Sequence, residues 1–326
     1  MKRGRIIASV VLVAVVGVAA FALNGCKRGG SDAKVLKLAF VTNNASEFWK
    51  IAGNGIKKYE AEGKVQVDIK MPPNGKPEEQ NEILENLLSQ GYDAIAVSVI
   101  APPDQVKILN KAAGKTKLIT FDSDAPQSDR LMYVGTVNYD AGQKLGGEIV
   151  KLLPNGGKMA VFVGTFSADN AAQRLKGIED AIKGKNIEVV ERREDQTDRA
   201  KARSNVEDIL NARPDVTLVC GLWSYNGPAI AAAIEGTNKK GKVIAAVFDE
   251  EDGTLKGIES GTITCTVVQH PFEMGYRSAK WMHQLASDFD KTKATIPGNK
   301  IDNTGVEVIE KGNVAEFQKR LADWKK

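Results

Sequence analysis

The distribution of apolar residues along the chain predicts alternating strands and helices. Short apolar runs rich in β-branched residues are each followed by a longer segment with the helical spacing of apolar positions. This alternation is typical of βαβ units, whose parallel strands are buried on both faces of the sheet. Strands are expected at residues 35–41, 65–70, 94–99, 117–121 and 131–135, and again at 159–163, 187–191, 216–220, 243–248 and 262–268. Helices are expected at residues 47–62, 78–90, 104–113, 139–152, 169–183, 198–211, 226–237 and 252–260.

The two series of elements resemble each other. In GYDAIAVSV and RPDVTLVCG a turn and an Asp precede an apolar strand, and in KLITFDSD and VIAAVFDEED an apolar strand ends in Phe-Asp. Two similar α/β lobes are the simplest interpretation of such an internal repeat. Asp122 and Asp249 then follow the carboxyl ends of equivalent strands, where open α/β sheets bind ligands. If the two lobes face each other, both carboxylates point into one cleft.

The first 26 residues have the pattern of an export signal. Three basic residues within the first five positions precede an uncharged apolar run over Ile6–Leu23. This pattern fits a cleaved lipoprotein signal, an uncleaved anchor or an ordinary signal peptide, and each of these places the rest of the chain outside the cytoplasm. The segment LNGC at 23–26 resembles the bacterial lipobox, which implies a signal peptide at residues 1–25 and acylation of the Cys26 thiol. The polar, Gly-rich residues 26–34 are then a tether between the extracytoplasmic domain and the membrane.

Composition and charge narrow the functional classes. The chain has 326 residues, 42% of them hydrophobic and 26% charged, which is typical of globular proteins and long enough for two domains. The formal net charge of +4 falls to +1 without the three basic residues at the start of the signal, so no basic nucleic-acid-binding surface is expected. The two His and three Cys have no metal-ligand spacing, and we expect neither a metal nor a cofactor.

Cys220 and Cys265 lie in apolar strands, either as two buried thiols or as a disulfide.

The loops that follow the predicted strands carry groups suited to a neutral, hydroxyl-rich ligand. Charged and amide side chains form paired hydrogen bonds with neighbouring hydroxyls, and aromatic rings cover the C–H faces of such a ligand. The candidates are Phe48, Trp49 and Trp223 among the aromatic residues and Asp122, Asn138, Arg174, Asp249 and Gln269 among the polar ones. Taken singly, each has an ordinary structural interpretation, because an Asp after a strand is also a common helix N-cap and a Trp on an apolar helix face is also a core residue.

In their order along the chain, these motifs resemble the periplasmic sugar-binding proteins of the ribose-binding type, which have the type I periplasmic-binding-protein fold. The resemblance covers residues 35–312 and rests on LAFVTNNASEFWK, ITFDSD, GTVNYDAG, AAQRLKGIEDAI, VFDEEDG and VVQHPFEMG. It implies a monosaccharide or small polyol as the ligand. It also implies a ligand-binding set of Ser46, Phe48, Trp49, Asp122, Asn138, Arg174, Trp223, Asp249 and Gln269.

Three positions depart from the ribose-type pattern. Ser46 stands where that pattern has an Asn, Trp223 takes the place of a polar Asn, and Thr197 stands where an aromatic residue is usual. The Trp223 ring is a candidate replacement for the one missing at Thr197. These differences leave the identity of the sugar open.

The resemblance also implies the domain organisation and the mechanism. The first lobe comprises residues 35–138 and 270–299, and the second comprises residues 139–269 and 300–326. Three crossover strands form a hinge between the two doubly wound parallel sheets, and the lobes close around a sugar in the cleft between them. The closed, loaded form is then recognised by an ABC permease in the membrane, and the protein is expected to be a monomer.

Other functions have less support in the sequence. The main alternative is a receptor that signals the presence of a sugar or polyol to a chemotaxis or kinase partner. No GxGxxG follows a strand and no GxSxG occurs, so we expect no enzyme activity. A related DNA-binding regulator would begin with a helix-turn-helix, but this chain begins with the pattern of an export signal, so we do not expect such a regulator. The acidic run at 249–252 has the side chains of a Ca²⁺ site, but its last three residues favour the positive N-terminal end of the next helix, which leaves Asp249 for the ligand.

Overall fold

The structure, a computed structural model, describes residues 35–44 and 46–326. The predicted signal peptide, the Cys26 lipidation site and the tether lie outside the described residues. Within these two ranges, no helix has both the length and the apolar content needed to cross a membrane.

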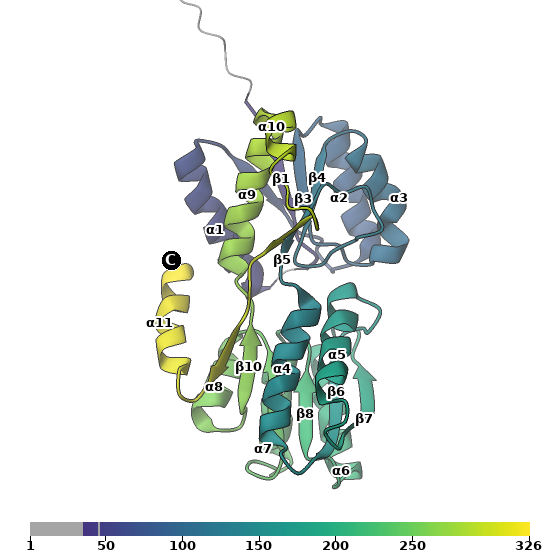
Figure 1. Cartoon of the computed structure of the whole chain (residues 1–326), viewed down its shortest axis with the longest axis vertical. Coiled ribbons are helices and arrows are strands. Elements are labelled where there is room, and N and C mark those ends of the chain that lie inside the picture. Colours follow the sequence, from purple (N-terminus) through teal and green to yellow (C-terminus); the bar gives the residue numbers. More distant parts are fainter. Residues whose placement is uncertain (1–34, 45) are drawn as a thin grey trace, which may run out of the picture. The chain divides into compact units, whose positions relative to one another are not determined.

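The first lobe is built on a parallel sheet of six strands (Figure 1). Across the sheet, the strands follow in the order β11 (Ile301–Asn303), β5 (Tyr133–Gly135), β4 (Lys117–Phe121), β3 (Ala94–Val97), β1 (Leu38–Val41) and β2 (Val67–Lys70). The helices of this lobe are α1 (Glu47–Gly63), α2 (Pro77–Ser89), α3 (Pro102–Ala113), α9 (Pro271–Ser287) and α10 (Phe289–Lys293).

Helices cover both faces of this sheet, and the residues of each strand alternate between the faces. Leu38 and Phe40 of β1 pack with α1 and α9, whereas Ala39 and Val41 pack on the opposite face with α2 and α3. The alternation arises because successive side chains in a strand point to opposite faces of the sheet. The result is a three-layer α/β/α lobe with an apolar core on each side of the sheet.

The second lobe repeats this architecture. Its strands follow in the order β12 (Glu307–Glu310), β10 (Cys265–Val268), β9 (Ile244–Phe248), β8 (Leu218–Gly221), β6 (Gly157–Val163) and β7 (Ile187–Glu194), and only the edge strand β12 is antiparallel to its neighbour. Its helices are α4 (Asn138–Leu152), α5 (Asp169–Ile182), α6 (Arg199–Ala212), α7 (Asn226–Gly236), α8 (Asp252–Ser260) and α11 (Val314–Trp324). Helices α4 and α5 cover one face of the sheet, and α6, α7, α8 and α11 contribute to the core on the other. The prediction of two similar α/β lobes is confirmed.

One helix pair in each lobe approaches closely through glycines. In the second lobe, a Cβ atom placed on Gly142 of α4 would lie 2.2 Å from the Arg174 carbonyl oxygen, and one on Gly177 of α5 would lie 2.2 Å from the Tyr139 carbonyl oxygen. The α1–α9 pair of the first lobe shows the same reciprocal arrangement at Gly55 and Gly275. Any side chain at these positions would push the helix backbones apart, so the glycines set how deeply each pair packs.

The chain passes between the two sheets three times, at residues 136–137, 269–270 and 304–306. The first two passages agree with the expected crossovers at Asn138 and Gln269. The third passage differs from the prediction, which assigned every residue from 300 onward to the second lobe. Residues 301–303 form β11 and pair in parallel with β5 of the first sheet. The short, partly exposed strand carries too few apolar residues to be found from the sequence pattern.

Cys220 and Cys265 are both buried and free. They lie on β8 and β10, on either side of β9, and both are in register with Ala246 of that central strand. The strand between them prevents a disulfide, because bonded cysteines need Cα atoms closer than about 7 Å whereas alternate strands lie roughly 9–10 Å apart.

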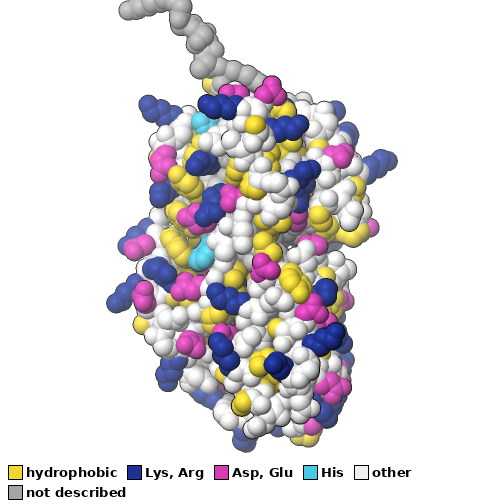
Figure 2. Space-filling view, in the orientation of Figure 1, with side chains coloured by type: hydrophobic (Ala, Val, Ile, Leu, Met, Phe, Trp, Pro, Cys, Tyr) yellow, Lys and Arg dark blue, Asp and Glu magenta, His cyan; other side chains and the backbone are white. Residues whose placement is uncertain are grey.

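The surface of the described residues agrees with the nearly neutral charge. On the face shown in Figure 2, basic and acidic side chains are interspersed rather than gathered into a stripe of one sign. Val35 and Met71 are the only large hydrophobic side chains that are exposed in the described ranges.

Candidate functional site

Asp122 and Asp249 occupy equivalent positions in the two lobes. Each follows the Phe that ends a central strand, β4 or β9, and each has a left-handed backbone, with φ of 56° and 68° respectively. Their main-chain N–H groups donate to Val134 of β5 and Val267 of β10, the next strand of each sheet. Asp and Asn adopt this conformation more readily than most residues, which suits them to the end of such a strand.

The Asp122 carboxylate is buried and accepts hydrogen bonds within the first lobe. Its Oδ2 accepts from Ser98 Oγ at 2.7 Å and from Asn43 Nδ2 at 3.3 Å. The pKa of Asp122 is raised to about 6, mainly by burial and to a smaller extent by the negative charge of Asp249, against the opposing effects of the Ser98 hydrogen bond and the positive charge of Arg174. Because Arg174 and Asp249 belong to the second lobe, ionisable groups of both lobes share one buried region.

Arg174 connects the parts of this region. It is 1% exposed, its Nε donates to Asn138 Oδ1 at 2.9 Å, and its Nη1 donates to the Leu222 carbonyl at 2.6 Å. The guanidinium lies over the Phe248 ring, 4.4 Å from its centroid, with Nη1 3.8 Å from Asp249 Oδ2. Its Nη2 has no hydrogen-bond partner among the residues that the structure describes. The sequence assigned Arg174 to the cleft, and the structure buries it beside Asp249 rather than exposing it on the surface of α5.

Asp249 and Gln269 form the second-lobe side of the same cluster. Gln269 Nε2 donates to Asp249 Oδ1 at 2.9 Å, while Gln269 Oε1 is buried without a partner in the described part of the chain. Burial raises the pKa of Asp249, and the charge of Arg174 and the Gln269 hydrogen bond oppose that effect. Buried polar atoms without partners are unfavourable, so a ligand that both donates and accepts hydrogen bonds would be stabilised here. Hydroxyl groups do both.

The predicted aromatic residues of the first lobe lie next to this cluster but are largely buried. Trp49 is 3% exposed, its ring packs edge-on against Phe121 at 5.6 Å between centroids, and its Nε1 donates to Asn44 Oδ1 at 3.0 Å. Phe48 packs edge-on against Trp49 at 4.8 Å. Core packing therefore buries most of the Trp49 surface. Because its ring contacts Phe121, the residue before Asp122, Trp49 lies at the carboxyl end of the sheet.

Trp223 is held beside Arg174 on the second lobe. Its Nε1 donates to Asn170 Oδ1 at 3.1 Å, and Asn170 lies one turn before Arg174 on α5. The Trp223 ring also packs on Gly164, where a Cβ atom would lie 2.1 Å from ring atom Cζ3. Trp223 directly follows Leu222, whose carbonyl oxygen binds Arg174. These contacts fix the indole ring between Asn170 at the start of α5 and Gly164 at the end of β6.

Ser46 lies directly before the first residue of α1. It precedes α1 in an extended conformation, is half-buried, and its side chain forms no capping hydrogen bond to the helix in the part of the chain that the structure describes. Conversely, Asn43, Ser98 and Asn170 were not predicted as site residues. Asn43 and Ser98 follow β1 and β3, which lie next to each other on one side of β4 in the sheet. The order of the strands, rather than the sequence pattern, brings both residues near Asp122 at the end of β4.

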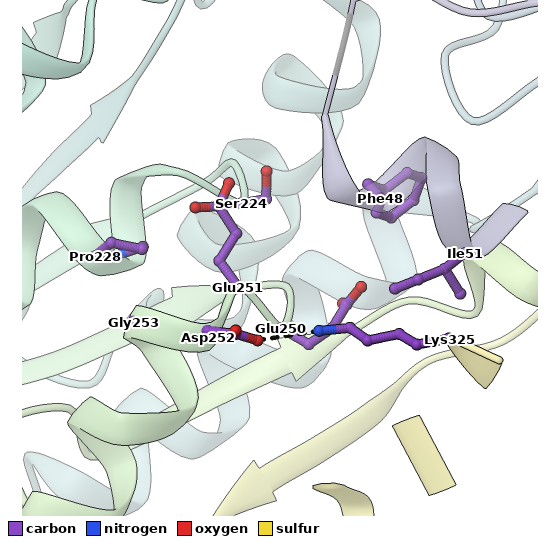
Figure 3. A pocket seen from close by; sticks show the side chains of 9 residues that line it. All are labelled: Phe48, Ile51, Ser224, Pro228, Glu250, Glu251, Asp252, Gly253 and Lys325. Atoms are coloured by element: carbon purple, nitrogen blue, oxygen red, sulfur yellow. Dashed lines mark hydrogen bonds and ion pairs between the residues drawn. The ribbon is translucent and has the colours of Figure 1, made fainter. Parts of the chain in front are cut away.

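A cavity of about 320 Å³ lies between α1 and the second lobe (Figure 3). It is lined by Phe48 and Ile51 of α1, by Ser224 and Pro228, by residues 250–253 and by Lys325. Phe48 is the only predicted site residue in its lining, and neither Asp122 nor Asp249 lines this cavity. Within the described residues, no group of three or more His, Cys, Asp or Glu side chains is arranged to hold a metal ion.

Comparison with known proteins agrees with this geometry. Residues 38–291 match the model of the periplasmic binding protein domain family. The D-allose-binding periplasmic protein of Escherichia coli K12 is 26% identical over 267 residues, which cover 78% of this chain and 85% of that protein. The xylose/arabinose-binding protein XylF of Sulfolobus acidocaldarius is 27% identical over 59% of this chain, but the match spans only 52% of XylF.

A solved structure shows the same fold over nearly its whole length. The ABC transporter solute-binding protein from Burkholderia graminis C4D1M, in complex with D-arabinose, superposes with a TM-score of 0.81 at 31% sequence identity. The superposition covers 86% of this chain and 97% of that one.

Proposed function

Because this chain belongs to the periplasmic binding protein domain family, we propose that it is the extracytoplasmic sugar-binding protein of an ABC-type importer. The observation that carries the proposal is the buried cluster in which Arg174 of one lobe interacts with Asp122 of the other and with Asp249. Two carboxylates and one guanidinium leave the cluster with one excess negative charge when all three are ionised. Such a site favours a neutral, hydroxyl-rich ligand and disfavours an anionic one.

The ligand of the proposal is a monosaccharide. Its hydroxyls accept from Arg174 Nη2 and donate to Gln269 Oε1, the two atoms of the cluster that lack partners in the described residues. Other hydroxyls donate to the two Asp carboxylates. Phe48, Trp49 and Trp223 contribute ring surface, and Asn138 positions Arg174 through the Nε hydrogen bond. The three connecting segments act as a hinge, and the lobes close around the sugar. Binding needs no covalent chemistry.

A panel of sugars tests this proposal by thermal shift. D-arabinose, D-ribose, D-allose and D-xylose are compared with glycerol and with D-glucuronate as an anionic control. A ligand that binds only the folded state adds about 2.7 kcal/mol of stability at roughly 100 times its Kd, so at least one neutral monosaccharide should raise the Tm while D-glucuronate should not. The absence of any shift with monosaccharides would contradict sugar binding by this chain.

Cys26 is proposed to anchor the protein to the outer face of the membrane. Replacing Cys26 with Ser removes the thiol that is acylated, so the full-length variant should move from the membrane fraction to the soluble extracytoplasmic fraction. The measurement is fractionation followed by immunoblotting, with Cys220→Ser as a control, since that thiol is buried in β8. Persistent membrane attachment of the Cys26→Ser variant would indicate an uncleaved apolar anchor instead.

The proposed partner is the membrane permease of the same importer, which recognises the closed, loaded form. The protein is proposed to act as a monomer, because the site is assembled from two lobes of a single chain. Co-purification with the permease in the presence of the bound sugar tests the partner.

A further inference from the structure

Helix α1 of the first lobe also packs against the second lobe. Ile51 is 2% exposed and belongs to the apolar cluster that includes residues of α6, α7, α8 and α11. One turn later, Asn54 Nδ2 donates to the Trp324 carbonyl oxygen at the end of α11, at 3.0 Å. The contact between the lobes therefore includes side chains of α1 as well as the three connecting segments.

The Glu250 side chain is enclosed at this contact. It is 5% exposed and lines the same cavity as Phe48 and Ile51, and Figure 3 shows it directed toward the side of the cavity that α1 forms. Its Oε2 is buried and has no hydrogen-bond partner anywhere in the described ranges. Burying an ionised carboxylate with one oxygen unpartnered costs much more free energy than burying the protonated carboxyl.

The neighbouring groups of the Glu250 loop do not compensate a negative charge. Asp249 and Glu251 flank Glu250 in the chain, and both carry the same sign of charge. Arg199 of α6 reaches this loop, but it forms a two-point ion pair with Glu251, at 2.9 and 3.0 Å. The guanidinium is therefore already engaged by another carboxylate.

One cation, Lys325, is among the residues that line the cavity, and it is also paired. Lys325 at the end of α11 lines the cavity, but its Nζ lies 3.0 Å from Asp252 Oδ1 at the start of α8. The residues that α1 contributes to the cavity lining, Phe48 and Ile51, are uncharged. Burial and the charge of Asp249 raise the pKa of Glu250 well above its ordinary value, and the charge of Glu251 adds a smaller increase. A hydrogen bond from the main-chain N–H of Glu250 and the charge of Lys325 oppose this shift only in part.

We propose that Glu250 is a proton-binding site that couples closure of the two lobes to acidic pH. The carboxyl is protonated while α1 covers it, and it ionises when the lobes separate and water reaches it. The coupling to sugar rests on the proposed function, since it requires that the sugar be bound by lobe closure. No residue of the Asp122–Arg174–Asp249 cluster has to change its contacts for this site to operate.

The direction of the pH effect follows from the raised pKa. A carboxyl whose pKa is higher in the closed form contributes its full stabilisation below the ordinary carboxyl pKa. That contribution is lost as the pH rises through the raised value. Sugar binding should therefore take up a fraction of a proton at Glu250, and the affinity should fall by up to about tenfold per pH unit in that range.

Thermal unfolding tests the proton site without any sugar. The wild-type protein, Glu250→Gln and the control Glu259→Gln, which alters an exposed carboxylate on α8, are compared between about pH 5 and about pH 8. Gln has the shape of a protonated Glu and cannot ionise, so the Tm of Glu250→Gln should exceed that of the wild type by an amount that grows with pH. Glu259→Gln should follow the wild type. A Tm difference that is the same at every pH would overturn the proposal.

Calorimetry then tests the coupling, with D-arabinose as the probe in two buffers of different ionisation enthalpy. The wild type should take up more protons on binding than Glu250→Gln does. Sugar binding with equal proton uptake in both proteins would refute the coupling and leave the proposed function intact.

If no sugar of the panel binds, the proposed function fails, and the Tm comparison alone decides the proton site. If Glu250→Gln does not fold, absence of proton uptake by the wild type would overturn the proposal.

Discussion

Replacement of Asp122 or of Asp249 by Ala is expected to weaken sugar binding by about 1.5–3 kcal/mol, or roughly 10- to 150-fold in Kd. Each variant removes a carboxylate that would accept hydrogen bonds from ligand hydroxyls in a region withdrawn from water. Both residues are at most 5% exposed, so bulk solvent cannot substitute for the lost acceptor. Because the pKa of Asp122 is about 6, the loss should be largest above that pH, where the wild-type carboxyl is ionised.

The matched control for Asp122→Ala is Asp129→Ala, which removes an exposed carboxylate from the same loop after β4. Titration calorimetry near pH 7.5 should show an unchanged Kd for the control and a weakened one for both cleft variants. Wild-type affinity in Asp122→Ala and Asp249→Ala, with the fold intact by circular dichroism, would show that neither carboxylate contacts the sugar.

A large loss of folding stability is expected when Gly142, at the contact between α4 and α5, is replaced by Ala. A Cβ atom at Gly142 would lie 2.2 Å from the carbonyl oxygen of Arg174, so Gly142→Ala must separate the two helix backbones. Overpacking of this kind costs about 1–3 kcal/mol of folding free energy, and a backbone-to-backbone clash belongs at the upper end of that range. The shift also moves Arg174 itself, so sugar affinity should fall together with stability.

Gly147 on the same helix provides a control, because its replacement by Ala should increase folding stability rather than decrease it. Nothing lies within 4 Å of a Cβ atom at that position, and Ala favours a helix over Gly by about 0.5–1 kcal/mol. Urea unfolding should therefore show destabilisation by Gly142→Ala and slight stabilisation by Gly147→Ala. Equal behaviour of the two variants would mean that the close approach of α4 and α5 does not hold in solution.

The sequence was informative where local pattern and tertiary structure agree. The apolar runs predicted strands such as Lys117–Phe121 with the correct bounds, because a strand buried on both faces must be apolar throughout. The repeated Phe-Asp predicted Asp122 and Asp249 as equivalent residues, and the structure gives them the same backbone conformation and the same strand-end hydrogen bond. Their role in binding a sugar stays a prediction.

Other features depend on contacts that no local pattern encodes. Ser98 approaches Asp122 only because β3 lies beside β4 in the sheet. Ile51 looks like any apolar position of a helix, yet it packs into the core of the other lobe. The strand Ile301–Asn303 pairs with β5 although its own sequence is largely polar. In each case the decisive partner is far away in the chain.

The most direct test is a crystal structure of the protein with the monosaccharide that gives the largest thermal shift. We expect the sugar in contact with Asp122 of the first lobe and with Asp249 and Arg174 Nη2 of the second, so that one ligand joins both lobes. A sugar bound in the cavity beside Glu250, or at any place where Asp122 and Asp249 do not both touch it, would contradict the assignment.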